Sequence, residues 1–400
     1  MLVAMPHPAP PSAGTPFPES RAATRAALLE AVESVRDVVA RHAEEAERAR
    51  TLPLPVVEAL RDSGLLALKL PRVLGGAEAD PVMQMDVIEA LTTIDASAGW
   101  CLMIGASAIG LPGAFLSDAG VARMFAGPRR PTGAGAIMPT GTAERAPGGH
   151  HLTGRWAFAS GVRHAEWMSA TARVNGTDGL RRFVFPVAEA VVHDTWHVVG
   201  LSGTGSCDVS VTDCFVPEEL SWDAVRARPQ RGGPLYALGL PAAVANEHVA
   251  FAIGVARRAL AEFTGEAGKR ARGFRSPGGL AAQPGIQRLV AECDLRLRAA
   301  RALAVELNEA AWGQASAGRE LDGTTQAELR AVATLATDVA LDVVQRVFRA
   351  AGGSALYLHG ALQRCLRDLT AGAQHLMVSD RAYEALGQFQ LGIAGADPMA

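Results

Sequence analysis

The residues best suited to acid–base chemistry stand near the carboxyl end of the chain. His375 stands seven positions after Asp368, and no Asp or Glu stands between Asp368 and Asp380. An imidazole exchanges a proton near neutral pH, which suits it to general acid–base catalysis, although a lone histidine on an apolar helix is commonly a packed core residue. If this stretch is helical, Asp368 lies two turns before His375 on the same face, about 10 Å away. Ser379 is then the nearer residue to orient the ring.

A second chemical feature is a hydroxyl at the end of a predicted strand. The segment from Leu152 to Gly161 alternates apolar and polar residues and ends in Ser160 and a glycine. Such a small, backbone-exposing end can approach a flat ring closely. Taken alone, the segment is also typical of an ordinary strand and turn, because a strand does not specify a function.

Basic and small residues at the ends of helical stretches could bind an anion. Arg272 and Arg275 flank Phe274 in a basic turn. Arginine forks suit phosphate, although charge runs of this kind usually face water. The pair Gly352 and Gly353 follows Gln345 at the end of a helical stretch, where a simple helix C-cap would also explain the glycines.

Three parts of the chain can be told apart by the period of their apolar residues. From residue 21 to about 126, the three- and four-residue spacing of Leu28, Val32 and Val35 predicts an antiparallel helical layer. Between about 127 and 235, short alternating runs predict a small antiparallel β-domain. From 236 to 400 the helical period returns in four stretches, which predict a four-helix bundle. These stretches are 241–266, 284–316, 324–350 and 361–388.

Several classes of function are disfavoured by composition. A net charge of −3 argues against nucleic-acid and anionic-membrane partners. The most apolar stretch, 101–116, is interrupted by glycines and Pro112 and is too short to cross a bilayer. The proline-rich residues 1–20 lack a signal-peptide pattern and predict a disordered leader. Five cysteines without CxxC or metal-ligand spacing fit a reducing cytoplasm and predict no metal.

The order of the elements also excludes a nicotinamide-binding domain. Such a domain requires alternating strands and helices with a parallel sheet. The glycine clusters at 133–135 and 200–205 lack the GxGxxG spacing, and no P-loop is present.

Four runs, taken together and in order, resemble the acyl-CoA dehydrogenase superfamily, and specifically its flavin-dependent monooxygenase branch. They are Leu65 to Gly76, Ser97 to Trp100, Trp156 to Gly161 and Gly200 to Pro217, and the resemblance extends from about residue 25 to 390. A dehydrogenase of this superfamily is expected to hold a carboxylate base near His375, because removing an α-proton from a thioester needs one. An imidazole in that place favours oxygen chemistry.

The resemblance implies an N-terminal helical domain, a central β-barrel and a C-terminal four-helix bundle, assembled as a homotetramer with flavin between barrel and bundle. Trp100 and Met103 would lie on the helix over the substrate pocket, although core packing explains them equally well. Ser160 would lie near the flavin N5 edge, where its hydroxyl can steady a peroxide. The remaining cofactor contacts would be Thr140, Gly141, Thr142, Trp156, Phe158, Arg272, Phe274, Gln345, Gly352 and Gly353.

The function that the resemblance implies is the oxygenase component of a two-component monooxygenase. Reduced flavin (FMNH2 or FADH2) would react with O2 to a C4a-hydroperoxide, and one oxygen would pass to an apolar, aromatic or polyketide-like substrate with His375 as acid or base. A separate NAD(P)H:flavin reductase would supply the flavin.

Other functions remain open on the sequence. One is an acyl-CoA dehydrogenase whose base has moved to Glu262 or Glu266. Others are N-oxygenation of an amino sugar, S-oxygenation of a heterocycle, and a flavin-free binding paralogue.

Overall fold

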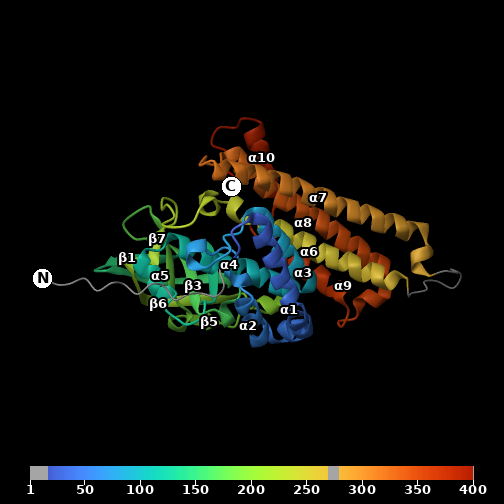
Figure 1. The fold of residues 1–400 in the computed structure, drawn as a ribbon, viewed down its shortest axis with the longest axis horizontal. Helices are drawn as coiled ribbons and strands as arrows, with labels where there is room; N and C mark the ends of the chain where they lie inside the picture. The colour runs from blue at the N-terminus through green and yellow to red at the C-terminus, as the bar shows by residue number, and fades with distance from the viewer. Residues whose placement is uncertain (1–16, 269–278, 400) are drawn as a thin grey trace.

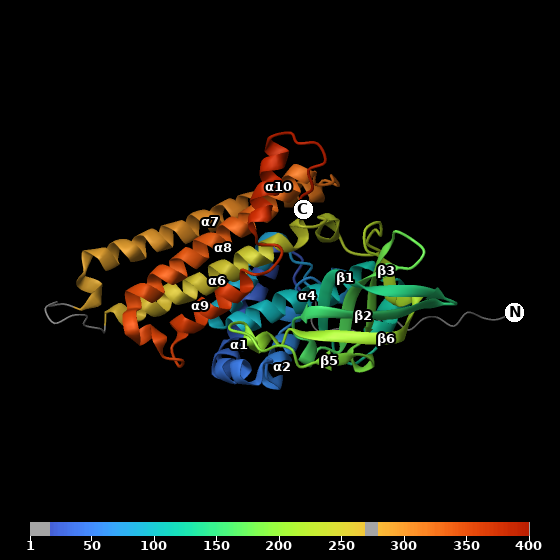
Figure 2. The same ribbon diagram turned by 180° about the vertical axis from the view of Figure 1, so that it is seen from behind.

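The β-domain and the long helices of the bundle lie at opposite ends of an elongated molecule, with the N-terminal helices between them (Figures 1 and 2). The computed structural model describes residues 17–268 and 279–399. In these residues the N-terminal helices contact both the sheet and the bundle. A site that uses all three parts must therefore lie where they meet.

The N-terminal layer contains five α-helices. Leu28, Val32, Val35 and Val39 are buried, which confirms the apolar face expected from their spacing. Asp80 begins the third helix by accepting the backbone N–H groups of Val82 and Met83, both at 3.0 Å. The helices are α1 (Arg21–Ala49), α2 (Leu54–Asp62), α3 (Pro81–Ile94), α4 (Ala96–Phe115) and α5 (Asp118–Met124).

Helix α4 is the central helix of this layer. It continues without a break through Gly105, Gly110 and Pro112 over 20 residues, so the expectation of an apolar stretch too short to cross a bilayer is wrong. The glycines allow close packing, since a Cβ on Gly110 would meet the Lys69 carbonyl oxygen at 2.5 Å. By length and composition α4 could cross a membrane, but 78% of its most apolar window is buried inside the protein, as in a core helix.

One sheet of seven strands forms the central domain, in the order β5-β6-β2-β1-β3-β4-β7. Among the described strands, β1 and β3 are the one parallel pair, and a register shift between Ala136 and Gly141 interrupts that pairing. The edge strands β5 and β7 pair with β6 and β4 but, within the described residues, not with each other, so the sheet is open where a closed barrel is expected. The strands are β1 (Gly133–Ala146), β2 (Gly149–Ala159), β3 (Trp167–Val174), β4 (Leu180–Pro186), β5 (Val191–His193), β6 (Cys207–Pro217) and β7 (Ser221–Asp223).

The C-terminal part contains α6 (Ala242–Ala267), α7 (Pro284–Ser316) and α8 (Gly323–Ala351), close to the predicted bounds. The expectation of one helix over 361–388 is wrong, because α9 (Ala361–Gly372) and α10 (Asp380–Gln390) are separate. Arg330 of α8 donates to the Leu376 carbonyl of the intervening segment at 3.0 Å, in place of a helical bond. The Thr334 hydroxyl of α8 lies 3.5 Å from the Ser379 carbonyl and 3.3 Å from the Arg330 carbonyl of its own helix.

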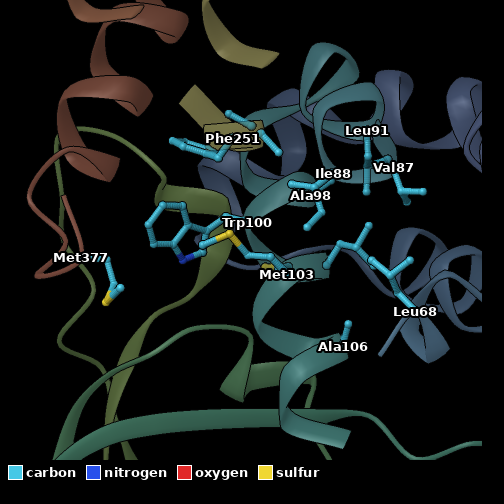
Figure 3. Packing of buried hydrophobic residues seen from close by; sticks show 14 of the residues in the cluster. Leu68, Val87, Ile88, Leu91, Ala98, Trp100, Met103, Ala106, Phe251 and Met377 are labelled. Atoms are coloured by element: carbon cyan, nitrogen blue, oxygen red, sulfur yellow. The ribbon is translucent and has the colours of Figure 1, made fainter. Parts of the chain in front are cut away.

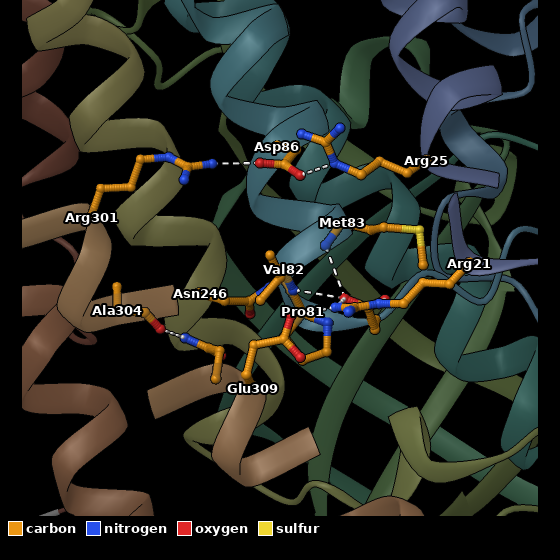
Figure 4. A network of polar contacts seen from close by, with 12 residues as sticks. Arg21, Arg25, Pro81, Val82, Met83, Asp86, Asn246, Arg301, Ala304 and Glu309 are labelled. Carbon is orange, nitrogen blue, oxygen red and sulfur yellow. Dashed lines mark hydrogen bonds and ion pairs between the residues drawn. The ribbon is translucent and has the colours of Figure 1, made fainter. Parts of the chain in front are cut away.

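A network of ion pairs joins α1, α3 and α7 (Figure 4). Asp86 on α3 accepts from Arg25 of α1 at 2.6 Å and also pairs with Arg301 of α7. Arg21 bridges Asp80 at 2.7 Å and Glu309 at 2.5 Å. These contacts fix the N-terminal layer against the bundle and so set the position of α4.

Candidate active site

Trp100 is the residue at which the three parts of the chain meet. Its indole N–H donates to the Ser160 hydroxyl, just after β2, at 3.1 Å. Its ring contacts Phe251 of α6 edge-on, with centroids 4.9 Å apart, and His375 edge-on at 5.7 Å. Figure 3 shows the indole extending from α4 between Phe251 and Met377. The structure thus brings together three predicted residues, Trp100, Ser160 and His375, from α4, the sheet and the α9–α10 segment.

His375 lies in the turn between α9 and α10, so it shares no helix face with Asp368 and the predicted helical geometry is wrong. Its Nδ1 accepts the backbone N–H of Met377 at 3.3 Å, and no bond to the Ser379 side chain is found among the described residues. The neutral ring therefore carries its proton on Nε2. Burial lowers the pKa of His375 to about 4, which corrects the expectation of a pKa near neutrality. At neutral pH this imidazole is a hydrogen-bond donor and only a weak base.

His248 is a second histidine in the cluster, and the sequence analysis missed it. Its ring lies 4.4 Å from the His375 ring at an angle of 30°, and 5.7 Å from the Trp100 ring. Burial is the main reason that the pKa of His248 is well below its usual value, and His375 and Lys69 lower it further. Lys69 itself pairs with Glu247 at 2.9 Å. No spacing in the sequence indicates this histidine, because His248 and His375 are distant in the chain.

The buried His248 and the partly buried His375 predict a loss of stability in mild acid. Both rings stay neutral in the folded protein, whereas the unfolded chain protonates them below about pH 6.5, so their contribution falls as the pH drops from about 6.5 towards 4. The free energy of unfolding of the wild-type protein should fall between pH 7 and pH 4.5. In His375→Asn we expect this fall to be about 2 kcal/mol smaller. Urea unfolding at the two pH values measures this difference. The control His197→Asn, at an exposed position, should show the same fall in the free energy of unfolding as the wild-type protein. A fall of the wild-type size in His375→Asn would contradict a neutral His375 ring in the folded protein.

Ser160 is the first of three hydroxyl groups in a buried row. Its Oγ lies 2.7 Å from the Ser206 Oγ, which lies 2.6 Å from the Thr204 Oγ1. Thr204 then donates to the Leu201 carbonyl at 2.8 Å. Ser206 and Thr204 belong to the run 200–217 used for the resemblance, but their row with Ser160 depends on the tertiary structure.

The surface beside Ser160 fits a flat, largely apolar ring. Phe158 has a φ of 60°, which is uncommon for a residue with a Cβ, and its side chain is 71% exposed. It meets the Trp196 ring edge-on at 6.2 Å. On the neighbouring strand, Met138 is also exposed, within the irregular part of β1. A flavin ring would need exposed apolar side chains against its flat face and a hydroxyl near its N5 edge, and this surface offers both.

The other residues predicted on these strands have different surroundings. Trp156 is buried and donates its indole N–H to the Thr171 carbonyl at 2.8 Å, so it supports the sheet from within. Gly141 makes room for it, since a Cβ there would lie 2.3 Å from the Trp156 ring. Thr140 and Thr142 are exposed, and the Thr140 hydroxyl donates to the Arg155 carbonyl at 2.7 Å.

Several predicted residues are not brought to Ser160. Met103 is buried in the hydrophobic core. Gln345 is exposed on α8, and Gly352 and Gly353 follow it at the end of that helix. Gln345 lies eleven residues, roughly 16 Å, along α8 from Thr334, which contacts the α9–α10 segment. Arg272 and Phe274 fall outside the described residues.

Glu262 and Glu266, the alternative bases of a dehydrogenase, do not reach Trp100, His248 and His375 within one chain. Glu262 and Glu266 stand fourteen and eighteen residues after His248 on α6, at least about 20 Å along the helix. They line an open groove of about 820 Å³ with Arg257 and Arg258. Asp368 is buried and accepts the Leu201 backbone N–H at 2.7 Å, so it serves the junction between sheet loop and α9.

Comparison with known proteins identifies the class to which this fold and site belong. The acyl-CoA dehydrogenase N-terminal domain matches residues 22–117, and the acyl-CoA dehydrogenase C-terminal domain matches residues 247–380. An indole-3-acetate monooxygenase from Pseudomonas putida is 31% identical over 352 residues, which cover 87% of this chain and 89% of that protein. The chain belongs to the acyl-CoA dehydrogenase superfamily.

Further relatives define the branch. The oxygenase component of an FADH2-dependent resorcinol hydroxylase from a Rhizobium species is 29% identical and covers 92% of this chain and 94% of its own length. The solved structure of XiaF from a Streptomyces species, in complex with FADH2 and glycerol, superposes with a TM-score of 0.86 at 26% identity, covering 95% and 98% of the two chains. The protein is a flavin-dependent monooxygenase, an oxygenase component that uses reduced flavin. It depends on a separate flavin reductase.

Proposed function

We propose that this oxygenase hydroxylates a small, apolar aromatic compound in a pocket between α4 and α6. The observation that carries the proposal is the meeting of Ser160, Trp100 and His375, where the exposed apolar surface of the sheet adjoins the two helices. Beyond Trp100, the partly exposed residues of α4 continue in one stripe, at Ile104, Ser107 and Leu111. This stripe is apolar except for Ser107, which accepts from Lys69 at 3.1 Å.

Aromatic compounds fit the surroundings better than sugars do. Phe251, Trp100 and the two imidazoles present ring edges and faces, which suit a planar substrate. The names of the relatives given above include indole-3-acetate and resorcinol, both aromatic. An amino sugar would need several polar partners in the pocket, whereas the stripe on α4 offers a single hydroxyl.

Each residue of the cluster has a role in this proposal. Bound reduced flavin supplies the electrons that activate O2. Ser160 faces the flavin N5 edge, and Trp100 fixes the position of its hydroxyl. The Nε2–H of His375 donates to the oxygen being transferred or to a substrate oxygen, which stabilises negative charge as it develops. The buried rings around them keep water out.

The assembly that we propose is a homotetramer in the cytoplasm. Gln345, Gly352 and Gly353 would then meet the flavin of a second subunit, since they lie far from Ser160 in their own chain. The segment that follows them exposes Leu356, Tyr357 and Leu358, which a partner subunit would cover. Five free cysteines support a reducing compartment.

The test supplies the purified protein with FMN or FAD reduced under nitrogen, and then with 18O2 and a panel of phenols and indoles. We expect one 18O atom in a hydroxylated aromatic product, detected by mass spectrometry. Oxygen incorporated only at nitrogen or sulfur would replace the proposal with heteroatom oxygenation. Bleaching of bound oxidised flavin by an acyl-CoA thioester under nitrogen would indicate a dehydrogenase instead.

A further inference from the structure

We propose that Ser206 and Thr204 hold the Ser160 hydroxyl as a hydrogen-bond acceptor towards the flavin, so that the site selects reduced over oxidised flavin. The proposal rests on the position of Ser160 beside N5 in the function proposed above. Ser206 and Thr204 are positioning residues in it, because they act through Ser160.

The two ends of the hydroxyl row determine its direction. The indole N–H of Trp100 can only donate, so Ser160 accepts in that bond. A backbone carbonyl can only accept, so a hydrogen bond at the 2.8 Å contact between Thr204 and Leu201 uses the single hydroxyl proton of Thr204. The distances within the two hydroxyl pairs allow either atom to donate, and a proton in every contact of the row requires Thr204 to accept from Ser206 at 2.6 Å and Ser206 to accept from Ser160 at 2.7 Å. Protons therefore point from Trp100 through Ser160, Ser206 and Thr204 to Leu201.

This direction leaves Ser160 without a proton to donate elsewhere. A hydroxyl oxygen has two lone pairs, and the Trp100 N–H occupies one of them. The second can accept a further N–H group. Ser160 is therefore suited to meet a donor and unsuited to meet an acceptor.

The two redox states of flavin differ in this respect at N5. Reduced flavin carries a hydrogen on N5 and can donate it to Ser160, whereas the N5 of oxidised flavin has a lone pair that would face the lone pair of Ser160. An oxygenase that receives flavin from a separate reductase gains from this difference, because oxidised flavin would otherwise occupy the site. The hydroxyl row is buried, and burial strengthens the preference by excluding water as an alternative partner.

The proposal predicts that shortening the row will release the Ser160 proton. In Ser206→Ala, Ser160 loses its acceptor and can turn its O–H towards N5, so oxidised flavin should bind more tightly relative to reduced flavin. In Thr204→Val, Ser206 loses its acceptor and can donate to Ser160, with the same result. The Leu201 carbonyl still accepts from the Trp196 indole at 3.0 Å in that variant, so no buried carbonyl is left without a partner.

The experiment measures the dissociation constants of oxidised FMN and of FMN reduced under nitrogen for the full-length protein stripped of flavin. We expect the dissociation constant of oxidised FMN, divided by that of reduced FMN, to fall roughly tenfold in both variants. This change is about the contribution of one ordinary hydrogen bond, and it corresponds to about 30 mV in the two-electron potential of bound flavin. Thr204→Ser keeps the hydroxyl and should restore the wild-type ratio. Ser202→Ala is the matched control, since Ser202 lies in the same turn and bonds the Val198 carbonyl outside the row.

The proposal is overturned if folded Ser206→Ala or Thr204→Val keeps the wild-type ratio of the two dissociation constants. It is also overturned if either variant prefers reduced flavin more strongly than the wild-type protein does. Thermal melting confirms the fold of each variant before binding is measured. Failure of the wild-type protein to bind reduced flavin would overturn the proposed function itself, which keeps the two failures distinct.

Discussion

Replacing His375 with alanine is expected to lower the rate of product formation by roughly 100-fold while leaving the affinity for reduced flavin almost unchanged. The neutral ring carries its proton on Nε2, because Nδ1 accepts from Met377, and in the function proposed above this donor stabilises charge on oxygen during transfer. Without it, oxygen activation should end in hydrogen peroxide more often. Single-turnover reactions that quantify product and peroxide together measure the change.

Two further results bear on the role of His375. Gln374→Ala changes the exposed neighbour in the same turn and should keep the wild-type ratio of product to peroxide. Because burial lowers the pKa of His375 to about 4, the rate should show no inflection from this residue between pH 6 and pH 8. Unchanged hydroxylation in His375→Ala would remove the residue from the mechanism.

Asp368→Asn is expected to stabilise the protein at pH 8 by about 2 to 4 kcal/mol. Burial, with Asp95 as a nearby carboxyl group, raises the pKa of Asp368 from 3.8 to about 7. The folded state therefore binds this proton more tightly than the unfolded state, and the cost of ionisation grows as the pH rises from about 4 and is complete above about 7. The asparagine carbonyl can still accept the Leu201 N–H, so the junction is retained.

Chemical denaturation at pH 8 and at pH 4.5 tests this expectation. The gain should be largest at pH 8 and nearly absent at pH 4.5, where the wild-type carboxyl group is already protonated. Asp178→Asn, at an exposed position, should change the unfolding free energy little at either pH. A loss of stability at pH 8 would show that the charge of Asp368 is needed in the folded protein.

The candidate site was predictable from the sequence only in part. His375 and Ser160 stood out because of the missing carboxylate near one and the small residues at the predicted strand end at the other. His248 and Ser206 carried no such signal, since a histidine in a buried helix and a serine in a glycine-rich turn are ordinary in sequence. The sequence analysis also missed the break between α9 and α10, where Arg330 of another helix binds the Leu376 carbonyl, because the period of apolar residues does not show contacts between distant segments.

The sequence by itself determined the order of the parts, the class of fold and most helix bounds. Apolar period and helix-starting residues act between near neighbours in the chain, and they can be read without knowing where distant segments lie. Only the tertiary structure decided which polar groups share protons. The row from Trp100 to Thr204 joins α4 to a turn about a hundred residues later, and its direction depends on an indole and a carbonyl that folding alone brings together. The protonation of His375 was decided in the same way, because burial against residues from other helices sets it.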